Sequence, residues 1–155
     1  MEVYNNFLSD DENVFVSDTL SGSGWKFGAV SNDDLKPIWM YDKVLAKPAI
    51  DLLASKLEGY EVIRYDINGQ TLGQDTSYHN DLADGTATHS LVYYPNDWHY
   101  MWGGRLHVFL ENDVACITPT KNFAVLFDAS LWHYTEGPTE NVLRVSIGLK
   151  LRKQQ

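Results

Sequence analysis

Cysteine is almost absent from the chain, and long apolar runs are absent altogether. Cys116 is the only cysteine, so the chain can form neither an internal disulfide nor a metal cage of several thiolates. No apolar run approaches the roughly 20 residues that a membrane-spanning helix needs. The first residues also lack the basic stretch and apolar segment of a signal peptide. These absences predict a protein of a reducing, cytoplasmic compartment that does not enter a membrane.

Basic residues are also scarce. The chain has 12 lysines and arginines against 21 aspartates and glutamates, which gives a formal net charge of −9. Because phosphate backbones attract positively charged surfaces, we expect no nucleic-acid partner. Lys150, Arg152 and Lys153 form a local basic ending, which we interpret as a solvated C-terminal tail.

The remaining composition is that of an ordinary globular domain. The 155 residues are 44% hydrophobic and 21% charged, which excludes a disordered chain and allows a sizeable core. Aromatic residues make up 13%, a share that suits either a β-rich core or a lined pocket. We expect one domain over residues 1–155, with helical support over about 1–59 and a β core over about 60–151.

The first part of the chain predicts a helix followed by extended structure. Ser9 and Glu12 have the spacing of a capping box, in which each side chain accepts a free backbone N–H of the other residue. The helix is expected to fade near Gly22 and Gly24. Residues 25–41 are expected to be extended or irregular.

A second helix is expected to begin near Pro48, because proline is tolerated in a first turn, and to end at Gly59. Its apolar face would consist of Ala49, Leu52, Leu53 and Leu57. The strand expected after it, 60–67, would end in an Asn68-Gly69 turn. Further strands are expected at 88–94, 106–110, 114–117, 123–127 and 143–149. Short strands at this spacing predict a sandwich, barrel or jelly roll, with mainly β structure.

The candidate metal ligands begin with His79-Asn80-Asp81. On a strand, residues two apart share a face, so this imidazole and carboxylate could hold one metal ion; a surface ion pair is the alternative. Two histidines and one carboxylate leave three positions of an octahedral metal open, as in non-haem Fe(II) oxygenases. His133, after a turn around residues 128–130, is the best third ligand. The other three histidines (His89, His99 and His107) are interpreted as structural.

Arg144 is the second unusual residue. It comes 11 positions after His133, within the otherwise apolar run 142–147, and Ser146 shares its face. A cation in such a strand is costly to bury without a partner, and a ligand carboxylate held by the guanidinium would be one. An internal aspartate or glutamate is the alternative partner.

Together these residues resemble a known pattern. His79-x-Asp81, then His133, then Arg144, is similar to the 2-oxoglutarate- and Fe(II)-dependent oxygenases, above all to their prolyl 4-hydroxylase-like branch. The similarity covers about residues 60–150. It extends to the entry at 68–75, to 91–96 with Tyr-Tyr-Pro-Asn, to the Trp-Gly-Gly-Arg-Leu turn at 102–106 and to 126–133.

The resemblance implies a fold and a ligand set. The fold would be the double-stranded β-helix, a jelly-roll variant, buttressed by the N-terminal helices. His79, Asp81 and His133 would bind Fe(II), and 2-oxoglutarate would place its far carboxylate on Arg144. O2 would be the second co-substrate, and ascorbate is a further candidate cofactor. Many collagen-type members have a lysine where Arg144 falls, so this chain is nearer to the arginine-using group.

The resemblance also implies helpers for Arg144. Tyr94, on the strand after the His-x-Asp motif, matches a tyrosine whose hydroxyl assists the arginine in hypoxia-type prolyl hydroxylases. Tyr65 is the candidate on the strand before the motif, and Ser146 is a third helper. Core packing is the alternative role for both tyrosines.

The implied reaction decarboxylates 2-oxoglutarate to succinate and CO2 and hydroxylates a C–H bond. Peptidyl proline is the first candidate substrate, and a free amino acid or small molecule is the second. The alternatives are a non-catalytic jelly-roll binding module, which needs neither Fe(II) nor 2-oxoglutarate, and a cupin-type isomerase, which does not need Arg144. Asp81 argues against the halogenase variant, in which a small residue replaces this carboxylate. Loops 70–78 and 95–103 are candidate lids, and the oligomeric state is left open.

Overall fold

The computed structural model describes residues 1–29, 36–82 and 85–154, and its strands form two antiparallel sheets. The larger sheet has seven strands, in the order β1 (Glu2–Asn5), β8 (Phe123–Asp128), β5 (His89–Tyr94), β10 (Arg144–Lys153), β4 (Tyr60–Gln70), β3 (Ile38–Tyr41) and β2 (Trp25–Ala29). The smaller sheet has the order β7 (Val114–Ile117), β6 (Leu106–Phe109) and β9 (His133–Thr135). The helices are α1 (Asp10–Thr19), α2 (Lys43–Ala54) and the short 3-10 helix η1 (Tyr100–Trp102).

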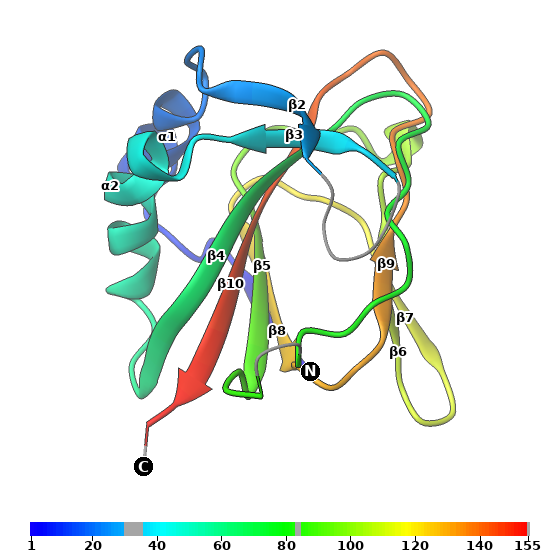
Figure 1. Cartoon of the computed structure of the whole chain (residues 1–155). Coiled ribbons are helices and arrows are strands. Elements are labelled where there is room, and N and C mark those ends of the chain that lie inside the picture. The colour runs from blue at the N-terminus through cyan, green and yellow to red at the C-terminus, as the bar shows by residue number, and fades with distance from the viewer. Residues whose placement is uncertain (30–35, 83–84, 155) are drawn as a thin grey trace.

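The two sheets face each other, and α1 and α2 cover the outer face of the larger sheet (Figure 1). This arrangement confirms the expected mainly β, jelly-roll fold with N-terminal helices. One apolar cluster lies between the helices and the larger sheet. A second lies between the sheets and contains Tyr94, Leu106, Val108, Ile117, Val125 and Phe127. The larger sheet is therefore packed by apolar side chains on both of its faces.

The first helix begins as the sequence predicts. Ser9 is the N-cap of α1: its hydroxyl accepts from the N–H of Glu12, and the Glu12 carboxylate accepts from the N–H of Ser9. The helix ends at Thr19, a few residues before the glycines expected to stop it. Its Asn13 is buried and donates to the Pro95 carbonyl, which ties α1 to the end of β5.

The expected start of the second helix was wrong. α2 begins at Lys43, because the Asp42 carboxylate caps it by accepting from the N–H groups of Val44 and Leu45. Pro48 thus lies inside the helix. The helix ends at Ala54, not at Gly59. Its buried residues are Ala46, Ala49, Ile50 and Leu53.

The turn expected at Asn68-Gly69 was also wrong. Both residues continue β4, which pairs with β10 on one side and with Met40 and Trp39 of β3 on the other. Gly69 permits this close approach, because a Cβ there would lie 2.7 Å from the Trp25 ring. The glycine therefore serves packing and not a turn. The other predicted strands are confirmed within a few residues, whereas β1 and β9 were not predicted.

Side chains of β10 alternate between the two faces of the larger sheet, and this alternation sets up the site. The odd-numbered residues from Val145 to Leu151 belong to the core beneath the helices. The even-numbered residues therefore face the smaller sheet; they are Arg144, Ser146, Gly148 and Lys150. Ser90 and Tyr94 present the same face from the neighbouring β5.

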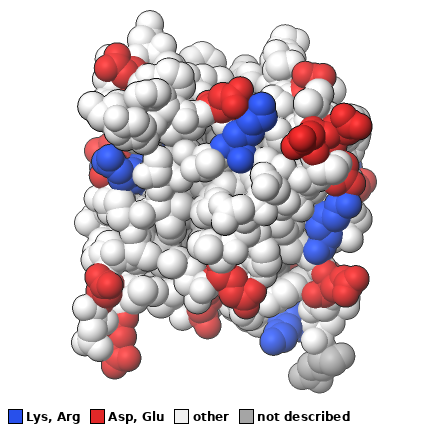
Figure 2. Space-filling view, turned by 180° about the vertical axis from the view of Figure 1, so that it is seen from behind, with Lys and Arg blue, Asp and Glu red and all other residues white. Residues whose placement is uncertain are grey.

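The outer surface reflects the acidic composition. Figure 2 shows a face on which acidic side chains are scattered and basic ones are few. Among the described residues, no helix is long and apolar enough to cross a membrane.

Candidate metal and co-substrate site

The two predicted histidine ligands are brought together by backbone pairing. His79 donates its N–H to the His133 carbonyl (3.0 Å), and His133 donates back to the His79 carbonyl (2.8 Å). This isolated antiparallel bridge joins the segment after β4 to β9. Side chains of directly opposed residues lie on one face, and the two rings are 4.3 Å apart between centroids.

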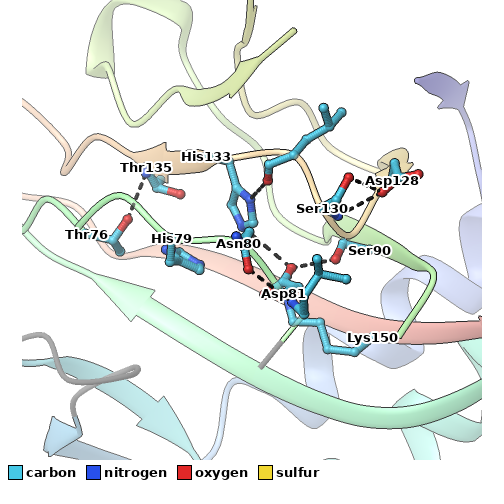
Figure 3. Close-up of polar contacts among 12 residues, drawn as sticks. Thr76, His79, Asn80, Asp81, Ser90, Asp128, Ser130, His133, Thr135 and Lys150 are labelled. Carbon is cyan, nitrogen blue, oxygen red and sulfur yellow. Dashed lines mark hydrogen bonds and ion pairs between the residues drawn. The ribbon is translucent and has the colours of Figure 1, made fainter. Parts of the chain in front are cut away.

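Asp81 completes the group. Its N–H donates to the Ala129 carbonyl (2.9 Å), so the turn before β9 also fixes the carboxylate. Ligand atoms of His79, Asp81 and His133 lie within 4.8 Å of one another, and Figure 3 shows the three side chains around one small space. Asp81 and His133 are both buried. Three residues of the predicted kinds thus converge with the spacing that a single ion needs.

Both imidazoles are oriented from behind by backbone carbonyls. Nδ1 of His79 lies 2.9 Å from the Ser77 carbonyl, and Nδ1 of His133 lies 2.9 Å from the Leu131 carbonyl. A carbonyl can only accept, so Nδ1 carries a hydrogen in each ring, and Nε2 is the nitrogen left to bind a metal. This is the tautomer that binds a metal through Nε2.

The protonation states also suit metal binding. Burial, with a smaller contribution from the nearby His79, lowers the pKa of His133 to about 4, so this ring is neutral at physiological pH. Burial alone would raise the pKa of Asp81, but the Lys150 ammonium, His133 and the Ser90 hydroxyl outweigh it and hold this pKa below its ordinary value. The site therefore offers a carboxylate and a neutral imidazole without first releasing protons.

The metal-free protein is expected to lose stability as the pH falls from about 7.5 to about 5. The pKa of His133 is about 4 when folded and 6.5 as its ordinary value. In this window the unfolded chain binds more protons, so the free energy of unfolding falls with pH. We expect His133 to contribute a loss of about 2 kcal/mol, measured by urea unfolding with a chelator present. His133→Gln has no such proton site, and an equal loss in this variant would contradict the assignment.

Lys150 is a site residue that the sequence analysis missed. It is not part of a solvated tail: it is buried, and its Nζ lies 2.5 Å from Oδ2 of Asp81. The Ser90 hydroxyl donates to the same oxygen (2.5 Å), and Nε2 of His133 lies 3.6 Å from it. Figure 3 shows Lys150 reaching Asp81 from β10. The signal available in the sequence was its even-numbered place on the strand that carries Arg144 and Ser146.

Arg144 lies farther along the same face of β10 and is almost fully buried. Its Nε donates to the Gly104 carbonyl (2.7 Å), and its Nη1 donates to Oε1 of Gln70 (2.9 Å). Among the described residues, no carboxylate lies within salt-bridge distance of it, so an internal acidic partner is not found there. Burial lowers the pKa of Arg144 and Tyr94 opposes this effect, yet an arginine keeps its proton in proteins. A buried cation with neutral partners is suited to bind an anion.

Two of the three expected helpers contact Arg144. The Tyr94 hydroxyl accepts from Nη2 (3.2 Å), and the Ser146 hydroxyl accepts from Nη1 (3.1 Å). Tyr65 does not join them. It pairs with Leu149, faces the helices and donates to the Lys43 carbonyl (3.1 Å). The position expected for a helper on β4 is filled by Gln70.

The Trp-Gly-Gly turn supports Arg144 from the opposite side. Gly104 has φ +70°, and a Cβ there would lie 3.0 Å from both the Arg144 side chain and the Trp98 ring. The turn can therefore bring its carbonyl to Nε only with glycine at this position. Gly104 and Gln70 were not predicted as site residues.

The remaining histidines lie outside the group. His107 pairs with Glu136 (2.7 Å), His99 caps η1, and His89 contacts Thr88 and Tyr60. Each has a structural partner, as the sequence indicated.

The two candidate lids differ in their attachments. Loop 70–78 is bonded to residues 135–138 at three points: Gly73 to Pro138 (2.9 Å), Thr76 to Thr135 (2.9 Å) and Gly137 to Asp75 (2.7 Å). These bonds fix the loop to the segment that follows β9. Loop 95–103 contains η1, whose Tyr100 and Met101 are exposed. A lid role for either loop stays a prediction.

A family model described as the 2OG-Fe(II) oxygenase superfamily matches residues 60–149, more than half of the chain. The chain belongs to this superfamily. The predicted family is thereby confirmed, as are Fe(II), 2-oxoglutarate and O2, which the family implies. Ascorbate stays a prediction.

Solved structures with a similar fold include two prolyl hydroxylases. One, from Trichoplax adhaerens in complex with a hypoxia inducible factor peptide, has a TM-score of 0.73 and 18% identity over 98% of this chain and 83% of its own. A Pseudomonas putida prolyl-4-hydroxylase has 0.72 and 18%, over 99% and 92%. A non-heme alpha ketoglutarate dependent epimerase from nogalamycin biosynthesis has 0.69 and 11%, over 97% and 76%. At such identities the likeness shows a common fold. Among curated proteins, no match is found.

The residues of this superfamily member fit its metal and co-substrate. Two imidazoles and one carboxylate are the donor set of a non-haem ferrous site with open positions. Arg144, with the Tyr94 hydroxyl beside it, presents a planar fork of donors, a geometry that suits a carboxylate.

Proposed function

We propose that this chain is an Fe(II)- and 2-oxoglutarate-dependent dioxygenase that hydroxylates a C–H bond, with peptidyl proline as the first candidate substrate. The observation that carries the proposal is the pairing of two features on one inner face. The His79, Asp81 and His133 group faces the side of β10 that also carries a buried Arg144, which has no carboxylate partner among the described residues. The family match and the two prolyl hydroxylases among similar structures support it.

Each residue has a defined task in this proposal. His79, Asp81 and His133 would hold Fe(II), which supplies O2 activation at the expense of 2-oxoglutarate, released as succinate and CO2. Arg144 binds the far carboxylate of 2-oxoglutarate through its guanidinium, and the Tyr94 hydroxyl adds a hydrogen bond to the same carboxylate.

The apolar cluster between the sheets protects the reaction. Phe127 packs edge-on against His133, with 5.1 Å between ring centroids, and Val108 and Leu106 extend the wall. These side chains exclude water behind the ligands and fix the ring of His133. A dry and rigid first coordination sphere is the contribution that the protein makes to cofactor chemistry.

The second candidate function is the same chemistry on a free amino acid or small molecule. Lys150 is the observation that favours it, because a buried ammonium beside the metal ligands does not suit a neutral prolyl residue. A cytoplasmic location and the absence of a nucleic-acid partner stay predictions.

An anaerobic titration of the chain with Fe(II) and 2-oxoglutarate tests the proposal. We expect a visible charge-transfer band that requires both components, because 2-oxoglutarate must chelate the ion that the triad holds. The matched control is His107→Ala, which removes a histidine outside the group and should leave the band unchanged. A folded protein with confirmed metal occupancy and no band would exclude the dioxygenase and favour a jelly-roll binding module.

A further inference from the structure

The hydrogen-bond donors of Arg144 are mostly taken by neutral groups of the protein. A guanidinium has five N–H donors. Nε donates to the Gly104 carbonyl, Nη1 donates to Gln70 and to Ser146, and Nη2 donates to the Tyr94 hydroxyl. Both hydrogens of Nη1 are thereby used, and one N–H remains on Nη2. An anion that approaches Arg144 therefore meets the Nη2 end of the guanidinium.

The Tyr94 hydroxyl adds a second donor at this end. It accepts from Nη2 of Arg144 (3.2 Å), so its own hydrogen is not used in that bond. Burial raises the pKa of Tyr94 above its ordinary value, against the opposing effect of Arg144, and the hydroxyl keeps its hydrogen at physiological pH. The Nη2 end thus offers one N–H and one O–H, whereas the Nη1 end serves to anchor the arginine.

Gln70 is the anchor that comes from the neighbouring strand. It lies directly opposite Arg144 in the pairing of β4 with β10, and it is 1% exposed. Its Oε1 accepts from Nη1 (2.9 Å), and its Nε2 donates to the Gln74 carbonyl (2.6 Å). Because that carbonyl can only accept, the amide nitrogen must face Gln74 and the amide oxygen must face Arg144. Both ends of the side chain are therefore fixed.

The Gln74 carbonyl is itself held in place. The N–H of Gly73 donates to the Pro138 carbonyl (2.9 Å), and the Gln74 side chain closes its own turn by accepting from the N–H of Thr71 (2.7 Å). A Cβ on Gly137 would collide with the backbone nitrogen of Gln74, so the two segments are packed against each other. Gln70 consequently joins Arg144 to a fixed point and not to a loose loop.

The absence of charge on Gln70 matters as much as its position. Glutamate has the shape of glutamine, and its carboxylate would stand where Oε1 lies, 2.9 Å from Nη1. The buried guanidinium would keep that carboxylate ionised, and the two groups would form a buried ion pair. The positive charge would then be compensated inside the protein. Glutamine makes the same hydrogen bond and leaves the charge available to a ligand.

We propose that Gln70 positions Arg144 for the co-substrate and sets the preference of the site for a 2-oxo acid with a second carboxylate. The inference rests on the proposed function, in which Arg144 binds the far carboxylate of 2-oxoglutarate. The amide of Gln70 holds Nη1 without compensating its charge, so the far carboxylate meets an uncompensated cation with its Nη2 donor exposed to it. Gln70 acts through Arg144 and is therefore a positioning residue.

The test measures the binding of two matched 2-oxo acids to the full chain loaded with Mn(II), by calorimetry. 2-Oxopentanoate has the five carbons of 2-oxoglutarate and a methyl group in place of the far carboxylate, so the ratio of the two Kd values isolates that carboxylate. In Gln70→Glu we expect the preference for 2-oxoglutarate to fall by about 30- to 150-fold, with the Kd of 2-oxopentanoate unchanged. Gln70→Met removes the bonds and adds no charge, so its preference should fall by about fivefold.

Steady-state succinate formation gives a second readout. Because Gln70 acts on binding of the far carboxylate, Gln70→Glu should raise the KM for 2-oxoglutarate and leave kcat within about twofold. The control is Gln154→Glu, which makes the same substitution on an exposed side chain near the end of the chain and should alter neither value.

The outcomes separate this inference from the proposed function. An unaltered preference in Gln70→Glu would overturn the inference, as would equal losses in Gln70→Glu and Gln70→Met, because a loss that ignores charge assigns Gln70 to packing. If Gln70→Glu does not fold, Gln70→Met decides: a retained preference supports the inference, and its complete loss overturns it. If the wild type binds the two acids equally, the assignment of Arg144 in the proposed function fails first.

Discussion

Replacing either histidine of the metal group is expected to abolish 2-oxoglutarate turnover while the fold survives. In His79→Ala or His133→Ala, two ligands remain where three are needed to hold the ion with open positions facing the co-substrate. The metal contributes several kcal/mol to the reaction, so its loss should lower the rate of succinate formation by at least about 1,000-fold. Succinate release with saturating Fe(II) measures the effect.

Survival of the fold follows from how the two histidines are placed. Their bridge is made by backbone N–H and carbonyl groups, which alanine retains. His79 is only half-buried, so its loss opens little space, whereas removal of the buried His133 leaves a gap beside Phe127. We expect losses of stability of at most about 3 kcal/mol, read from the unfolding midpoint. His107→Ala is the matched control, and near-normal turnover in either ligand variant would overturn the assignment.

The metal group was predictable because its evidence is local and chemical. His79 and Asp81 are two apart, and His133 follows a recognisable strand and turn. Such spacing does not depend on regular secondary structure: His79 lies in an isolated bridge outside the named strands, and the three side chains still converge. The capping box of α1 was predictable for the same reason, since it depends on residues three apart.

Residues placed by pairing between distant strands were harder to predict. Tyr65 was chosen for its hydroxyl and its position before the motif, but its register with Leu149 turns it toward the helices. Gln70, opposite Arg144, occupies the inner face instead. Strand register decides between these two residues, and the sequence alone did not reveal that register.

Local signals failed where tertiary packing outweighed them. Pro48 and Asn68-Gly69 are typical of a helix start and a turn, yet the Asp42 cap and the approach of Trp25 to Gly69 place them inside a helix and a strand. Lys150 was assigned to a tail because basic residues follow it. Extending the alternation of Arg144 and Ser146 by two steps would have placed it on the inner face.

Replacing Arg144 with methionine is expected to raise the KM for 2-oxoglutarate by about 30- to 150-fold, with a smaller effect on kcat. A charge-assisted bond to a buried arginine contributes about 2–3 kcal/mol, and this range corresponds to that change in affinity. The far carboxylate takes no part in the chemistry, so removal of its partner weakens binding above all. Tyr94→Phe, which removes one hydroxyl from the same receptor, should have a smaller effect of about fivefold.

Arg144→Lys separates charge from geometry. The guanidinium makes four hydrogen bonds, to Gly104, Gln70, Ser146 and Tyr94. A lysine keeps the charge but lacks the planar fork that these partners orient, so we expect an intermediate KM. Arg105→Met, which removes a half-exposed arginine of the adjacent turn, is the control and should leave the KM unchanged. Unaltered 2-oxoglutarate affinity in Arg144→Met would leave the buried cation without a ligand and would assign it to holding the Trp-Gly-Gly turn through the Gly104 carbonyl.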